Sequence, residues 1–160
     1  MVKRITLIDV DNGDETAALR SLLTSMEFAV RLLAVGDGAQ VNSTLHDAAS
    51  DAVVILSARA GRRGLTLNGQ DPVAMVEAFR GITFGSDTIL ISTAEATRES
   101  GLIQVMLNAG GQLVAPNGTP DRAIIVPWIG ACLLAAPRGL AGAVAMANTL
   151  VSASNRFNYG

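Results

Sequence analysis

Short apolar runs alternate with amphipathic segments along the first 136 residues, and their order predicts five strand–helix units. Each run is a few residues long and rich in β-branched or other apolar side chains, which favours buried strands. The predicted strands are Lys3–Asp9, Ala29–Ala34, Ala52–Ser57, Thr88–Ser92 and Gln112–Ala115. The segments between them repeat apolar residues at helical spacing. The predicted helices are Glu15–Met26, Asp37–Ala49, Asp71–Arg80, Thr97–Asn108 and Pro120–Ala135.

Turn and capping residues support these boundaries. Asn12, Gly13 and Asp14 precede the first helix, and Pro72 stands in the first turn of the third. Continuous apolar strands that alternate with helices predict a three-layer α/β domain with a doubly wound, parallel, five-stranded sheet. Right-handed crossovers favour the flavodoxin-like strand order 2-1-3-4-5. Pro127 predicts a kink in the fifth helix.

Two segments fall outside this alternation. Residues 137–160 carry a weak helical stripe, formed by Leu140, Val144, Leu150 and Val151. We expect residues 1–136 to form the α/β domain and residues 137–160 to form a helical extension that packs on it or mediates dimerisation. The loop at residues 58–70 is rich in Gly and Arg but lacks a P-loop ending. Long loops at an active edge are often functional, so we hypothesise that this loop covers the strand ends.

Composition excludes several classes of protein. A net charge of −2 leaves no basic footprint for nucleic acid. The most apolar run, at residues 123–136, is shorter than a membrane span and contains Pro127. The first residues turn acidic after a short apolar stretch, so we expect no signal peptide there. The single cysteine, Cys132, excludes an internal disulfide and a cysteine zinc site. We therefore expect a cytoplasmic protein without a membrane partner.

Functional groups of doubly wound folds gather at the carboxyl ends of the strands. In this chain those ends carry Asp9 and Asp11 after the first strand, Leu56 and Ser57 at the third, Thr93 after the fourth, and Ala115 and Pro116 at the fifth. The series resembles the receiver domain of response regulators over residues 3–135. Receivers carry an acidic pair, a phosphorylated aspartate, a Thr-Ala and a Lys-Pro at these places.

The departures from the receiver pattern remove its chemistry. No Asp or Glu lies between Asp51 and Asp71, and Ala115 stands at the lysine position. Phosphoryl transfer needs the nucleophile, a Mg²⁺ ion and cations around the phosphate. Asp9 and Asp11 supply only half of a metal site, so Mg²⁺ binding should be weak. The resemblance implies a phosphorylation-independent receiver-like signalling module that is not an enzyme and needs no cofactor.

The expected partner of this module is another protein or a second copy of the chain. Apolar residues of the fifth helix and the tail are the interface candidates, and an exposed patch there would mark the interface. These candidates are Trp128, Ile129, Leu133, Leu140 and Val144.

A second resemblance is to caspase-like peptidases. The segments SARAG (Ser57–Gly61) and STAEA (Ser92–Ala96) occupy the places of the family's His-Gly and Ser-Ala-Cys. Ala60 and Ala94 then stand at the histidine and cysteine positions, so this alternative is also inactive. Strand order 2-1-3-4-5 would favour the receiver, and an added antiparallel pair would favour the peptidase fold. A small-molecule binder that uses the same strand ends is a third alternative.

Overall fold

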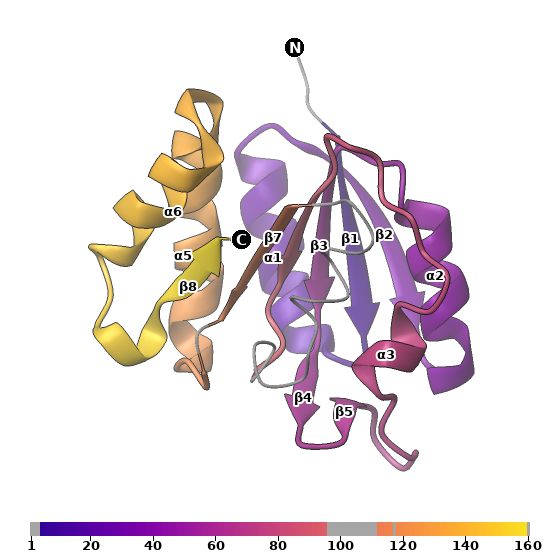
Figure 1. Ribbon diagram of the computed structural model, residues 1–160. Helices are drawn as coiled ribbons and strands as arrows, with labels where there is room; N and C mark the ends of the chain where they lie inside the picture. Colours follow the sequence, from indigo (N-terminus) through magenta and orange to yellow (C-terminus); the bar gives the residue numbers. More distant parts are fainter. Residues whose placement is uncertain (1–3, 96–111, 117, 160) are drawn as a thin grey trace.

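The computed structural model describes residues 4–95, 112–116 and 118–159, which fold around one six-stranded sheet (Figure 1). The strands follow the order β2-β1-β3-β6-β7-β8. Five of them run parallel: β1 (Arg4–Val10), β2 (Ala29–Val35), β3 (Val53–Ser57), β6 (Ile89–Ser92) and β7 (Gln112–Pro116). The sixth, β8 (Phe157–Tyr159), is antiparallel to β7 and forms the edge.

Helices cover both faces of the sheet. One layer holds α1 (Gly13–Ser25), α5 (Arg122–Ala135) and α6 (Leu140–Asn148). The other holds α2 (Val41–Ala48) and the single turn α3 (Met75–Ala78). Short 3₁₀ turns occur in the described ranges at Gly38–Gln40, Ala136–Arg138 and Ala153–Asn155. Among the described residues, no helix combines the length and hydropathy that a membrane crossing requires.

The central strands are apolar because both of their faces are buried. Successive side chains of a strand point to opposite faces of the sheet. Thus Leu7 and Ile55 pack in the core beneath α1 and α5, whereas Ile8 and Leu56 pack in the core beneath α2. All four side chains are fully buried. The α/β class and the mostly parallel sheet therefore follow the sequence pattern.

The predicted five-stranded sheet was wrong in strand count and in strand order, because β8 adds a sixth strand beside β7. This strand comes from the C-terminal segment that was expected to be helical throughout. Its side chain Phe157 is 0% exposed and stacks on Trp128 with the ring centroids 4.0 Å apart. Burying a large aromatic side chain in this way favours the strand over continuation of the helix.

Asn148 fixes this tail to α5. Its side-chain Oδ1 accepts hydrogen bonds from Trp128 Nε1 at 3.1 Å and from the backbone N–H of Phe157 at 3.0 Å. Its Nδ2 donates to the carbonyl of Phe157 at 2.8 Å. The segment at residues 137–160 therefore packs on the domain through α6 and β8.

The loop at residues 58–70 contains a β-hairpin that the sequence did not predict. Its strands are β4 (Arg59–Gly61) and β5 (Gly64–Thr66), which pair antiparallel. Leu65 also exchanges two backbone hydrogen bonds with Val73, at 2.8 and 2.9 Å. Gly64 (φ +119°) is required at the close approach, because a Cβ atom there would lie 2.1 Å from the carbonyl oxygen of Val73.

This pairing explains why the predicted helix Asp71–Arg80 shortens to Met75–Ala78. The backbone at Val73 is extended against β5, so the helical turn begins only after Ala74. The predicted helix Thr97–Asn108 lies outside the described residues, and so do the glycines that follow it. Pro127 lies inside α5.

Phe157→Ala should lower the free energy of unfolding by about 3 kcal/mol, because it removes a buried aromatic ring and leaves a cavity beside Trp128. Urea denaturation measures this change. Leu150→Ala is the control, since that side chain is 68% exposed, and its effect should stay within about 0.5 kcal/mol. Equal effects of the two substitutions would show that the tail is not part of the core.

Candidate functional site

A largely buried carboxylate lies at the carboxyl ends of β3 and β6. Figure 1 shows the β4–β5 hairpin directly after the end of β3. The carboxylate belongs to Glu15 in the first turn of α1, whose side chain is 9% exposed. Glu15 Oε2 accepts hydrogen bonds from Asn12 Nδ2 at 2.6 Å, Ser57 Oγ at 2.6 Å and Thr93 Oγ1 at 2.7 Å. Three polar side chains from the ends of three different segments therefore converge on one oxygen.

The second oxygen of Glu15 binds Arg122, which begins α5. Arg122 Nη2 donates to Glu15 Oε1 at 2.8 Å, and Nη1 donates to Glu95 Oε1 at 2.8 Å. Arg59 of the hairpin donates its Nε–H to the same oxygen of Glu95. We call these four charged residues (Glu15, Arg122, Glu95 and Arg59) the crevice network.

Backbone carbonyls complete the surroundings of Arg122. Its Nη1 donates to the carbonyl of Thr93 at 2.8 Å, and its Nη2 donates to the carbonyl of Ala58 at 3.2 Å. Burial lowers the pKa of Arg122, and the charges of Glu15 and Glu95 act in the opposite direction. Charge-assisted hydrogen bonds of this kind offset much of the cost of removing both charges from water.

The two strand-end hydroxyls are used inside the fold. Ser57 and Thr93 are fully buried, and each donates its hydroxyl proton to Glu15. Ser57 Oγ also accepts from Asn12 Nδ2 at 3.1 Å, and Thr93 Oγ1 accepts from the backbone N–H of Ala58 at 3.1 Å. A carboxylate beside a serine hydroxyl could in principle accept its proton. Here the hydroxyl has no exposed surface on which a substrate could lie.

The two aspartates at the end of the first strand, Asp9 and Asp11, accept hydrogen bonds from backbone N–H groups of loops. Asp9 Oδ1 accepts from the backbone N–H of Asn12 at 2.8 Å. Asp11, at φ 49°, accepts from the backbone N–H of Asn68 at 2.5 Å. The second contact places part of the loop at residues 58–70 against the strand-end edge, which agrees with the hypothesis that this loop covers it. No cluster of three or more metal-ligating side chains occurs among the described residues.

The other strand-end candidates do not join the crevice network through any contact of the described residues. Leu56 is a core side chain on the α2 side of the sheet. Ala115 and Pro116 pair with Asn158 and Phe157 of β8. The residues of the predicted pocket are thus divided. Ser57 and Thr93 bind Glu15, whereas Ala115 and Pro116 pair with the unexpected edge strand β8.

Sequence analysis did not single out any residue of the crevice network. The signal was positional: Arg59 and Glu95 each follow a strand-end hydroxyl by two residues, and Glu15 and Arg122 each stand in the first turn of a helix. Charged residues at such places converge when parallel strands end at the same edge. Their pairing still depends on tertiary structure that no local pattern specifies.

The predicted interface residues lie in the core between the sheet, α5 and α6. Leu140 is partly buried against this core. The other four are buried in it: Trp128, Ile129, Leu133 and Val144. They do not form the exposed patch that would mark an interface, because the tail folds back over α5 and covers them.

The thiol and imidazole groups of the chain lie far from peptidase positions. The one cysteine, Cys132, is buried in α5, and the one histidine, His46, is exposed on α2, across the sheet. Ala94 is buried after β6, and Ala60 lies in β4 opposite Leu65. A thiolate–imidazole dyad therefore cannot form at this crevice.

Comparison with known proteins adds no assignment: no protein-family model matches this chain, and no curated protein matches it significantly.

Glu15→Gln should lower the free energy of unfolding by about 3 kcal/mol, because Arg122 would remain partly buried without its main counter-charge. Urea denaturation at neutral pH measures the change. The matched control is Glu77→Gln, which breaks an exposed ion pair with Arg80 and should cost no more than about 0.5 kcal/mol. Similar losses in both variants would show that the network is an ordinary surface feature.

Burial raises the pKa of the Cys132 thiol from 9.0 to about 11. In the unfolded chain the thiol ionises near pH 9, whereas in the folded protein it stays protonated until about pH 11. Its contribution to stability is therefore complete below pH 9 and decreases as the pH rises from 9 to 11. Urea unfolding at several pH values should show a smaller decrease in Cys132→Ala than in the wild type; identical slopes would exclude this titration.

Proposed function

We propose that this chain is a non-catalytic protein-interaction module built on a caspase-like frame. The observation that carries the proposal is the fully engaged Glu15 carboxylate. Its two oxygens accept four hydrogen bonds, from Asn12, Ser57, Thr93 and Arg122. The polar atoms that could perform chemistry at the strand ends are thereby committed to holding the fold together.

Two antiparallel pairings support the caspase-like frame. Strand order 2-1-3-4-5 was expected to favour the receiver and an added antiparallel pair the peptidase fold, and antiparallel pairing occurs twice. The hairpin β4–β5 follows β3 directly, and β8 lies antiparallel at the edge of the sheet. The parallel strands alone run β2-β1-β3-β6-β7, the order expected for the receiver, so the proposal rests on the added antiparallel pairs.

The charges of the crevice support a structural role for this site. Arg59 and Glu95 follow the two strands whose ends would carry a peptidase's catalytic groups, and they bind one another. This ion pair bridges the hairpin and the end of β6. Arg122 binds Glu95 as well and joins the bridge to α5.

The receiver-like interpretation leads to the same functional statement. Leu56 and Ser57, at the end of β3, carry no carboxylate that a phosphodonor could modify, and both side chains are buried. Asp9 and Asp11 each accept a backbone hydrogen bond in a loop. We therefore propose that signalling through this domain depends on binding and is independent of phosphorylation.

Both kinds of chemistry can be tested on the whole chain. The protein is incubated with a peptide library that varies the residue before the cleaved bond, and separately with acetyl phosphate and Mg²⁺. We expect no cleavage above the protein-free rate, no phosphoryl adduct in the intact mass and no change in sedimentation. The matched variant is Glu15→Gln. Cleavage by the wild type that this variant loses, or a phosphoryl adduct, would contradict the proposal.

A further inference from the structure

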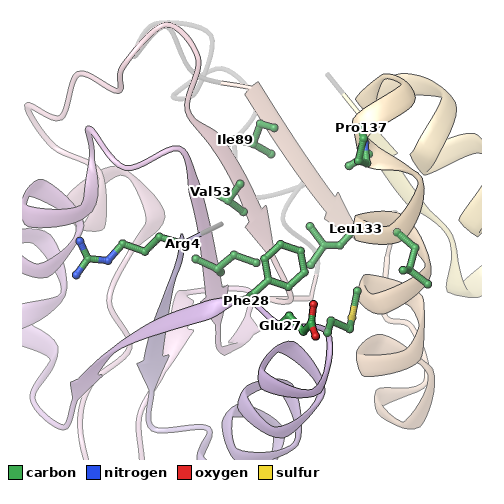
Figure 2. A pocket seen from close by; sticks show the side chains of 11 residues that line it. Arg4, Glu27, Phe28, Val53, Ile89, Leu133 and Pro137 are labelled. Atoms are coloured by element: carbon green, nitrogen blue, oxygen red, sulfur yellow. The ribbon is translucent and has the colours of Figure 1, made fainter. Parts of the chain in front are cut away.

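An apolar pocket of about 410 Å³ opens at the end of the sheet opposite to the crevice network (Figure 2). It lies at the amino ends of β1, β3 and β6, between the chain after α1 and the last turn of α5. Its walls are mainly apolar and include Ile5, Met26, Phe28, Val53 and Ile89. A pocket of this size and lining is large enough to hold an aliphatic side chain of another molecule.

A strongly exposed leucine is among the residues that line the same pocket. Leu134 is 73% exposed, which is the largest exposed fraction among the large hydrophobic residues that the structure describes. Its neighbour Leu133 turns into the core, and Pro137 follows on the same rim (Figure 2). One surface therefore carries both an apolar pocket and an exposed apolar side chain, Leu134.

The rim also carries two charges of opposite sign. Arg4 and Glu27 both line the pocket, and Figure 2 shows Arg4 on the side away from Leu133. Neither side chain forms an ion pair with any residue of the described ranges. A surface that presents one free cation and one free anion can satisfy both charges against a copy of itself.

We infer that this surface is the interface of a symmetric homodimer, in which Leu134 of each copy enters the pocket of the other. A two-fold interface uses the same patch on both subunits, so that patch must be complementary to itself. A pocket with an exposed apolar side chain beside it meets this requirement. Arg4 of one copy then faces Glu27 of the other around the apolar centre, as a polar rim. The inference goes beyond the proposed function, because it names a second copy as partner and holds whatever the crevice does.

Sedimentation velocity over a range of concentrations tests the inference. The wild type should form a dimer, and Leu134→Glu should weaken its association at least tenfold, because a carboxylate would have to enter an apolar pocket. The matched control is Leu150→Glu, a similarly exposed leucine outside the pocket lining, which should dimerise like the wild type. Circular dichroism verifies that both variants are folded.

Charge reversal gives an independent arm. Arg4→Glu and Glu27→Arg should each weaken the dimer, and the double variant should recover most of the association. A wild type that stays monomeric, a Leu134→Glu variant that still dimerises, or a Leu150→Glu variant that dissociates equally would overturn the inference. These outcomes concern mass alone, so they are distinct from the peptide and phosphodonor assays of the crevice.

Discussion

The ion pair between Glu15 and Arg122 is the constraint on which the strand-end edge depends. It joins the first turn of α1 to the first turn of α5, and the same carboxylate binds the hydroxyls at the ends of β3 and β6. Two charges this poorly exposed persist only when nearly every donor and acceptor is satisfied. The hydrogen bonds of Arg122 to two backbone carbonyls meet that requirement. The result is a polar centre whose hydrogen bonds are made within the fold, and its residues Glu15, Arg59 and Arg122 line a pocket of about 510 Å³.

The spacing of apolar residues along the chain and their types were sufficient to predict the parallel part of the sheet. Runs such as Val53–Ser57 are buried on both faces, and only a sheet between two helical layers buries them so. The same patterns failed where a few residues change partner. Phe157 lies in a strand of the predicted helical extension and stacks on Trp128, and Val73 pairs with Leu65 at the place where a helix was expected. Pairing between different elements decided both cases, and the hydrophobic period of a single segment carries no information about it.

The candidate site was predicted in position but not in composition. Ser57 and Thr93 do lie together at the strand ends, because parallel strands finish at one edge. Glu15 and Arg122, which organise them, are 107 residues apart and resemble ordinary first-turn residues of two helices. The interface residues were misplaced for a related reason: Trp128 and its neighbours are apolar because they form the core beneath the tail. Leu134 has the largest exposed fraction among the large hydrophobic side chains of the described residues, and it lines a pocket that no sequence motif indicates.

The central claim is that Glu15 and Arg122 act as one unit. A double-mutant cycle measures this directly, with Glu15→Gln, Arg122→Gln and the double variant compared by urea denaturation. If the pair holds the edge together, the double variant should lose clearly less stability than the sum of the two single losses, with a coupling of about 2 kcal/mol. Single losses that add to within about 0.5 kcal/mol would contradict the account, because the two side chains would then contribute independently.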